Sequence, residues 1–147
     1  MHELLGTWTL ESYVTEDLET REKTQPYGAH PTGYLNYGPD GRMYAILVHE
    51  NRKAPPSLHA TDAESVELYR GLAAYAGTYS FDGDRVSHHV DVSWNETWTG
   101  TTQLRQFKID GNFLRIQSTI TNPLTGRESS YVLVWRKIES VRPQRSQ

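Results

Sequence analysis

Eight short segments that favour β-strands are separated, in regular alternation, by tight turns and by long connections. Each segment is rich in β-branched or aromatic residues, and together they cover 6–14, 33–37, 42–49, 77–81, 85–93, 102–109, 112–120 and 129–138. Turn-forming residues follow the second, fourth and sixth segments, as Pro39-Asp40-Gly41, Asp82-Gly83-Asp84 and Asp110-Gly111. The other connections are long and cover 15–32, 50–76, 94–101 and 121–128.

This alternation constrains the topology more than any single motif does. In an up-and-down arrangement, alternate connections lie at the same end of the sheet, so the short turns close one end and the long loops crowd the other. Eight antiparallel strands can also close into a barrel that is wide enough inside for one small ligand. We therefore predict an all-β, eight-stranded antiparallel up-and-down barrel, with an eight-stranded sandwich as the alternative.

One helix is predicted within the connection 50–76, between the third and fourth strands. Thr61 and Glu64 have the spacing of a capping box, which satisfies backbone donors at a helix start. Apolar residues then recur at three- and four-residue spacing, as Val66, Tyr69, Leu72, Ala73 and Ala76. Gly77 is a suitable stop. We expect this helix to lie beside or over the open end of the barrel.

The length and charge of the chain indicate how many domains it has and exclude some classes of protein. The 147 residues fit one domain, and we expect a barrel over 1–139 followed by a flexible tail over 140–147. A net charge of −3 argues against a nucleic-acid binder that relies on a basic field. The chain has no cysteine, no apolar run long enough for a transmembrane helix, and a start that does not resemble a signal peptide. These features predict a cytoplasmic protein, and closure of the barrel, which removes sheet edges, predicts a monomer or a weak homodimer.

The aromatic content is high for so polar a chain. Nine tyrosines, four tryptophans and three phenylalanines occur in a sequence that is only 36% hydrophobic. Tyrosine and tryptophan combine an apolar ring with a polar group, so they suit the lining of a cavity better than a dry core.

Hairpin register predicts that two polar residues face inward. If Asp110-Gly111 is a two-residue turn, Phe107 pairs with Leu114 and both lie on the inner face, which places Arg105 there too. The turn at Asp82-Gly83-Asp84 pairs Phe81 with Val86 and Tyr79 with His88. His88 then belongs to an inward run with its alternate neighbours Val86, Val90 and Val92.

The second hairpin is less decisive because both of its faces are partly apolar. We choose as interior the set Tyr34, Asn36, Met43, Ala45, Leu47 and His49. The alternative interior set is Leu35, Tyr37, Tyr44, Ile46 and Val48. In the last strand we expect Tyr131, Leu133 and Trp135 to face inward.

Several stretches resemble a known family. Gly6-Thr7-Trp8 is similar to the Gly-x-Trp signature of lipocalin and calycin barrels. Over nearly the whole chain, LLGTWTLESY, GYLNYGPDGRMYA, AAYAGTYSF, VSHHVDVS, WTGTTQLRQF and YVLVWRKI resemble the bacterial and fungal lipocalin-like domain family.

The resemblance implies an eight-stranded barrel with its helix between strands three and four. It also implies that Trp8 plugs the closed end and that a basic residue after the last strand packs across it by a cation–π contact. We assign that role to Arg136, with Lys137 as the alternative. Unlike secreted lipocalins, the chain lacks disulfide cysteines and their second signature. Some related barrels resemble cyclases or isomerases of natural-product pathways.

The inward polar residues are the candidates for chemistry. His88 is a candidate general acid or base, because an imidazole titrates near neutral pH. Its alternative role is structural, with a hydrogen bond to Tyr79 or to the backbone. Arg105 is a candidate for stabilising an oxyanion or binding a carboxylate, and its alternative is a structural arginine satisfied by water or neighbouring oxygens. The candidate ligand-binding residues are Tyr34, Asn36, Met43, His49, Tyr79, Trp98, Gln103, Phe107 and Tyr131.

Three functions remain open from the sequence. The first is binding of a small, largely apolar molecule, aromatic or polyketide-like, in the barrel. The second is a cofactor-independent isomerase or cyclase that uses His88 and Arg105. The third is a protein-interaction module with an exposed apolar patch around Trp98. We expect no metal and no cofactor, because the histidines lack metal-site spacing and no phosphate- or dinucleotide-binding motif occurs.

Overall fold

The computed structural model describes residues 2–121, 124–141 and 143–146. Met1, residues 122–123 of the connection 121–128, and residues 142 and 147 of the predicted tail lie outside the described residues. The strands are β1 (Gly6–Asp17), β2 (Lys23–Thr24), β3 (Thr32–Tyr37), β4 (Arg42–Val48), β5 (Leu72–Asp82), β6 (Arg85–Ser93), β7 (Thr102–Asp110), β8 (Phe113–Thr121) and β9 (Glu128–Lys137). Helix α1 (Asp62–Arg70) lies between β4 and β5.

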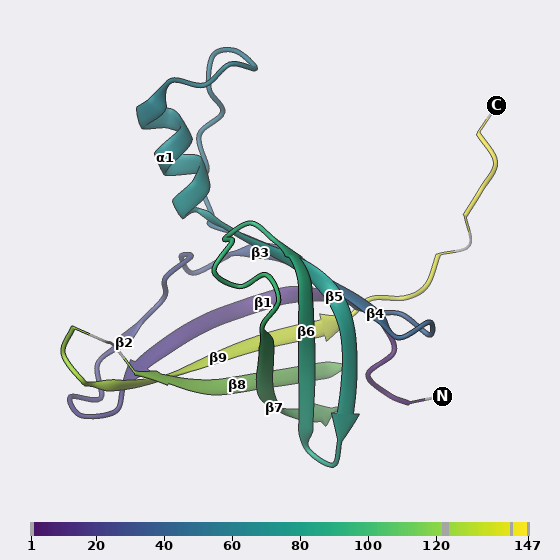
Figure 1. Cartoon of the computed structure of the whole chain (residues 1–147). Coiled ribbons are helices and arrows are strands. Elements are labelled where there is room, and N and C mark those ends of the chain that lie inside the picture. Colours follow the sequence, from purple (N-terminus) through teal and green to yellow (C-terminus); the bar gives the residue numbers. More distant parts are fainter. Residues whose placement is uncertain (1, 122–123, 142, 147) are drawn as a thin grey trace.

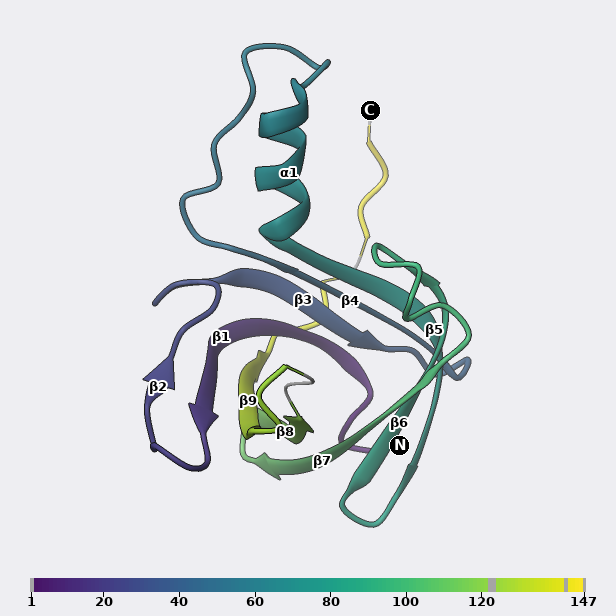
Figure 2. The ribbon, with the colours of Figure 1, turned by 60° about the vertical axis from the view of Figure 1, so that its left-hand side comes forward.

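The strands form a closed antiparallel barrel, which confirms the predicted fold class. Neighbours along the chain pair in order from β3 to β9, and β1 pairs with both β3 and β9 to close the ring. The two-residue strand β2 pairs only with β1 and lies outside the ring (Figure 2). The other eight strands are those expected from the alternating connections, and α1 occupies the predicted place between the third and fourth of them.

Helix α1 begins as predicted and ends earlier. The Thr61 hydroxyl accepts from the Glu64 backbone and the Glu64 side chain accepts from the Thr61 backbone, which completes the capping box. The helix ends at Arg70, and residues 72–76 belong to β5, where they pair with β4. The prediction of helix up to Gly77 is therefore wrong, because the ladder with β4 outweighs the helical spacing of the apolar residues.

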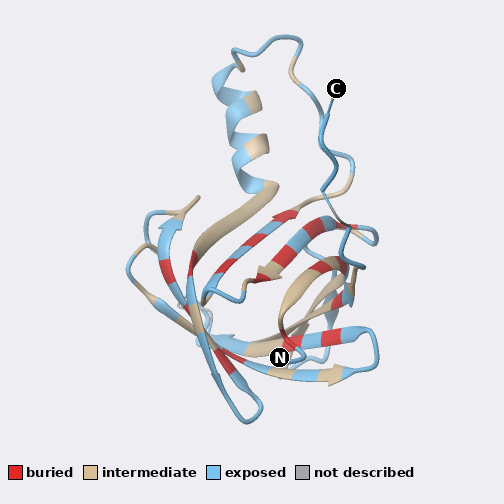
Figure 3. Ribbon diagram, turned by 90° about the vertical axis from the view of Figure 1, so that its right-hand side faces the viewer, coloured by how far each residue is buried: buried red, intermediate tan, exposed pale blue. Residues whose placement is uncertain are grey.

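Helix α1 projects away from the barrel (Figure 1). None of its residues is buried, as the absence of red along the helix in Figure 3 shows. It packs against the beginning of the sheet at β5. No helix among the described residues is long and apolar enough to cross a membrane.

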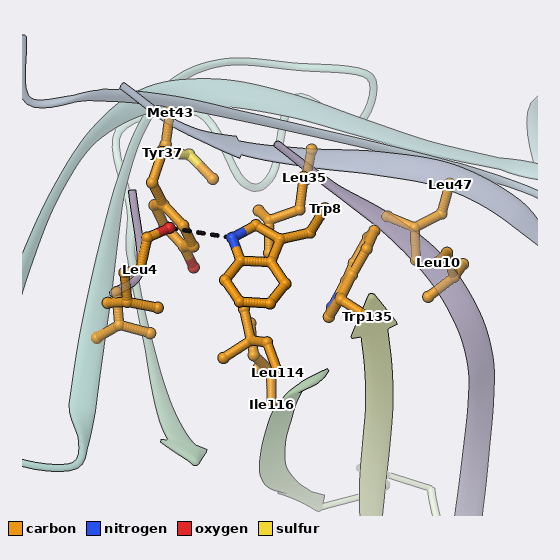
Figure 4. Close-up of a cluster of buried hydrophobic side chains, with 12 residues drawn as sticks. Leu4, Trp8, Leu10, Leu35, Tyr37, Met43, Leu47, Leu114, Ile116 and Trp135 are labelled. Atoms are coloured by element: carbon orange, nitrogen blue, oxygen red, sulfur yellow. Dashed lines mark hydrogen bonds between the residues drawn. The ribbon is translucent and has the colours of Figure 1, made fainter. Parts of the chain in front are cut away.

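The core at one end of the barrel is built around two tryptophans. Trp8 and Trp135 lie side by side (Figure 4) and are almost completely buried. The Trp8 indole nitrogen donates to the Leu4 carbonyl over 3.0 Å. The Nζ atom of Lys137 lies 4.5 Å from the centre of the Trp8 ring. Lys137 therefore makes the expected cation–π contact, whereas Arg136 points outward and pairs with Glu11 at 2.7 Å, so the assignment to Arg136 is wrong.

The register of two hairpins agrees with the predicted faces. Tyr79 pairs with His88 and Phe81 pairs with Val86, as expected. In the β7–β8 hairpin Phe107 pairs with Ile116 rather than with Leu114, because the turn is centred one residue later than predicted. The partner changes by two residues and the inner face stays the same, since side chains alternate with period two. Arg105 accordingly faces inward.

The predicted faces are wrong for β3 and for the end of β6. Tyr37 pairs with Met43, so β3 turns Leu35 and Tyr37 inward and leaves Tyr34 half exposed on the outer face. Five residues separate Tyr37 from its partner Met43, and because this number is odd, odd-numbered positions of β3 pair with odd-numbered positions of β4. In β6 the pairing shifts between Ala76 and Gly77 of β5, and after this bulge Val92 is exposed instead of inward.

Candidate functional site

Arg105 is a buried cation inside the barrel. Its side chain comes from the inner face of β7, and the residue is only 8% exposed. The Nη1 atom donates to the Leu104 carbonyl over 3.2 Å, and Nη2 donates to the Gln103 side-chain oxygen over 3.4 Å. Both distances are long for charge-assisted hydrogen bonds. In the described part of the chain Arg105 has no carboxylate partner, so most of its five N–H donors remain unused.

Aromatic rings enclose the Arg105 guanidinium. Its Cζ atom lies 5.4 Å from the centre of the Tyr131 ring on β9 and 5.8 Å from the Trp98 ring in the β6–β7 loop. Trp98 also contacts Tyr75 of β5, with ring centres 5.3 Å apart, and Trp94, at 5.2 Å. The rings place flat apolar surfaces beside the guanidinium.

A second buried group is a Tyr–His–Tyr relay next to this cation. The Tyr37 hydroxyl lies 2.6 Å from Nε2 of His88, and the Tyr75 hydroxyl lies 2.8 Å from Nδ1. His88 is almost completely buried. Burial, together with the positive charge of Arg105, lowers the pKa of His88 to about 3. Burial also raises the pKa of Tyr75 to about 12 and that of Tyr37 well above its ordinary value. All three groups are therefore uncharged near pH 7.

The relay has a preferred direction. A neutral imidazole has one nitrogen that donates and one that accepts. Tyr37 is fully buried, and His88 is its only side-chain hydrogen-bond partner among the described residues, so its proton must point to Nε2 to avoid an unsatisfied donor. From this network we assign the proton of His88 to Nδ1, which donates to the Tyr75 oxygen. The Tyr75 hydroxyl proton is then available to a molecule beside Trp98 and Arg105.

The structure gathers some of the predicted site residues and separates others. Gln103, Trp98 and Tyr131 meet at Arg105. Tyr34 and Asn36 do not line the interior, because Tyr34 is exposed and Asn36 donates to the Thr7 hydroxyl over 2.7 Å.

The remaining predicted residues have other surroundings. Met43 lies in the core cluster, against which Phe107 packs, and Phe107 also contacts the His2 ring at 6.3 Å. Tyr79 donates to the Gly38 carbonyl over 2.7 Å rather than to His88. His49 packs on Tyr27 and borders a hollow of about 720 Å³ between α1 and the segment 49–56.

Sequence reasoning missed Tyr37 and Tyr75, which hold the imidazole on both sides. Tyr37 belongs to the face of β3 that was not chosen, and Tyr75 lies in the stretch assigned to the helix. Only the general excess of tyrosine could have indicated them.

The barrel wall is open beside Arg105. Pairing between β7 and β8 ends at Gln106 and Gln117, after which β7 follows β6 and β8 follows β9 (Figure 1). A hollow of about 760 Å³ begins at this divergence and extends over the outer face of β8, β9 and β1. Its edges are Leu104, Arg105 and Gln106 on β7 and Gln117, Ser118 and Thr119 on β8. We call it the β7–β8 hollow.

Within the described residues, no three or more His, Cys, Asp or Glu side chains are grouped so that they could hold a metal ion. The arrangement around Arg105 offers hydrogen-bond donors and aromatic surfaces instead. It can hold an oxygen acceptor on an otherwise apolar molecule.

Comparisons with known proteins agree with this architecture. The model of the lipocalin-like domain family matches residues 5–138. The 4'-hydroxy-3'-methoxypropiophenone carrier protein of Aspergillus oryzae is 32% identical over 89 residues, which cover 55% of this chain and 80% of that protein. No solved structure matches the chain. With the closed barrel and the family match over nearly its whole length, the chain belongs to the lipocalin-like domain family.

Proposed function

We propose that this protein binds a small, largely apolar molecule, aromatic or polyketide-like, inside the barrel next to Arg105, and that it acts as a carrier. The observation that carries the proposal is the buried guanidinium without a carboxylate partner among the described residues. A buried charge without a counter-ion is costly, and a ligand oxygen beside it would offset that cost. The rings of Trp98 and Tyr131 beside it suit an aromatic body.

The relative from Aspergillus oryzae supports this class of ligand. The molecule in its name is an aromatic ketone with a phenolic hydroxyl, which combines one apolar ring with oxygen acceptors. The same combination fits aromatic surfaces around a cluster of donors.

The enzyme alternative rests on the buried imidazole beside a cation. A proton transfer to His88 would resemble general-base catalysis, with Arg105 holding an enolate. However, a pKa of about 3 makes His88 a weak base near pH 7, and tyrosine hydroxyls occupy both of its nitrogens. These features favour a positioning role for His88 and support the carrier. The third candidate, an interaction module, is not favoured, since Trp98 packs against Tyr75 and Arg105.

Binding is tested with 4'-hydroxy-3'-methoxypropiophenone as the probe. We expect saturable quenching of tryptophan fluorescence and a matching heat of binding by calorimetry. Trp98→Phe should remove most of the quenching, while the control Trp94→Phe, which lacks the contact with Arg105, should retain it. Absence of saturable binding for this ketone and for related aromatic acids would contradict the proposal.

The same samples distinguish a carrier from an isomerase. We expect NMR spectra of the probe to show the same compound after prolonged incubation with the protein. Conversion that depends on both His88 and Arg105 would instead support the enzyme alternative.

A further inference from the structure

The charge of the β7–β8 hollow is opposite to that of the whole chain. Its charged lining residues are Lys23, Arg85, Arg105, Arg115 and a single acid, Glu16. The chain as a whole carries −3. In the described part of the chain, no ion pair engages Lys23, Arg85 or Arg115. A concave surface lined by one sign of charge concentrates ions of the opposite sign.

The residues around Arg105, on the inner side of the barrel wall from the hollow, offer hydrogen-bond donors. Arg105 keeps unused N–H groups there. The Tyr75 hydroxyl, directed by His88, has a free proton, and Trp98 contacts both the Tyr75 ring and the guanidinium. Such a set stabilises an oxygen that carries negative charge more than a neutral one, because the guanidinium then attracts an opposite charge and the Tyr75 hydroxyl donates to an ionised acceptor.

The gap between β7 and β8 is a candidate entrance for a ligand. The β7–β8 ladder stops one residue pair before Arg105, and Arg105 is among the residues that line the hollow at this point. Arg85 and Arg115 line the same hollow as Arg105.

We propose that the ligand is an organic anion, with an apolar body and one carboxylate or phenolate oxygen, which enters through the β7–β8 hollow and is held by Arg105 and the Tyr75 hydroxyl. This inference rests on the proposed function and specifies the charge of the ligand and its route. Arg85 and Arg115 are the residues that guide it, and Tyr37 and His88 position Tyr75.

The charge is tested with two fluorescent probes that differ by one anionic group. The anion is 8-anilinonaphthalene-1-sulfonate, and N-phenyl-1-naphthylamine is the neutral compound. We expect Arg105→Met to weaken binding of the anion by about tenfold or more and that of the neutral probe by less than about twofold. Lys108→Met, which removes an exposed charge elsewhere on β7, should change neither.

The hydrogen bonds among Tyr37, His88 and Tyr75 allow a further test. Its result differs between a role in positioning the Tyr75 hydroxyl and a purely structural role. Tyr37→Phe deprives Nε2 of its donor, so the imidazole can accept from Tyr75 instead and the free proton of Tyr75 is lost. We expect selective weakening of the anionic probe by a few-fold. Equal weakening of both probes would contradict the positioning role.

The route is tested without changing Arg105. The chain has no cysteine, so Leu104→Cys can be labelled alone with a bulky maleimide at the edge of the hollow. We expect the label to slow association of the anionic probe at least about tenfold, whereas the same label on Lys108→Cys should not. Arg115→Glu should slow the same step most at low ionic strength.

The possible outcomes distinguish failure of small-molecule binding from failure of anion recognition. If neither probe binds saturably, the proposed function fails and the inference fails with it. If both bind and Arg105→Met weakens them equally, anion recognition is wrong while small-molecule binding stands. If Arg105→Met does not fold, Arg105→Lys replaces it, and loss of the bidentate donors should again weaken only the anion. Unchanged association after labelling of Leu104→Cys would overturn the lateral route.

Discussion

His88 links the stability of the protein to pH. Its pKa is held at about 3 by burial, compared with 6.5 for an unperturbed histidine. Between these values the unfolded chain binds one more proton than the native state, so stability falls as the pH is lowered. We expect His88 to reduce the free energy of unfolding by up to about 1.4 kcal/mol per pH unit below pH ~6.5. Urea denaturation between pH 7 and pH 4.5 measures this slope.

His89 is the matched control for this prediction. It is adjacent in the chain but lies exposed on the outer face of β6. His88→Gln should flatten the dependence of stability on pH, and His89→Gln should leave it nearly unchanged. Equal slopes in all three proteins would show that His88 is not the residue responsible.

Lys137 and Arg136 are adjacent in the chain, but we expect them to contribute different amounts to the free energy of unfolding. Lys137 lies over the Trp8 ring, and its Nζ donates to the carbonyls of Glu3 and Leu5. Lys137→Met should therefore lower the free energy of unfolding by about 1–3 kcal/mol. Arg136→Met removes only a solvent-exposed ion pair with Glu11 and should cost about 0–1 kcal/mol. Midpoints of denaturant unfolding provide the comparison, and the reverse order would contradict it.

At the scale of elements, Gly77 illustrates how one residue type can indicate two structures. A glycine after an apolar helical stripe is typical of a helix end, which was our interpretation. In the structure Gly77 lies within β5 at the bulge opposite β6, where a Cβ atom would collide with the His89 carbonyl. The glycine allows the two backbones to approach closely.

Gly77→Ala tests this close approach. The collision involves backbone rather than a flexible side chain, so we expect destabilisation by about 1–3 kcal/mol. Gly71→Ala at the end of α1 is the control, because there the added carbon would meet only ordinary contacts. Thermal unfolding followed by circular dichroism compares the two variants, and a neutral Gly77→Ala would contradict the argument.

The strand elements were predictable to the extent that local signals are strong. The turn Asp82-Gly83-Asp84 placed His88 on the correct face, and the β7–β8 turn did so for Arg105 despite an error of one residue in its centre. The β3–β4 connection gave the wrong face for β3, since two apolar faces compete and the parity of the loop decides between them. Bulges were not predictable, because they arise where two ladders must fit one curved wall.

At the scale of the whole molecule, ligand binding should raise the free energy of unfolding of the barrel. A ligand that binds only the folded barrel stabilises it by RT ln(1 + [L]/Kd), which is about 2.7 kcal/mol at a hundred times Kd. For a chain of 147 residues this should raise Tm by about 5–10 °C. Differential scanning calorimetry with 4'-hydroxy-3'-methoxypropiophenone or 8-anilinonaphthalene-1-sulfonate measures the shift. Arg105→Met should lose it for the anionic probe, and an unchanged Tm at saturation would contradict specific binding.

The sequence by itself determined the number and order of the long strands, the barrel they form, the place of the helix and the inward direction of His88 and Arg105. These follow from turn chemistry and from alternation with period two, which act between residues close in the chain. The tertiary structure decided that Tyr37 and Tyr75 hold His88, that Lys137 covers Trp8, and that β7 leaves β8 beside Arg105. These depend on how strands distant in sequence curve and pair around the barrel, and no local pattern records that geometry.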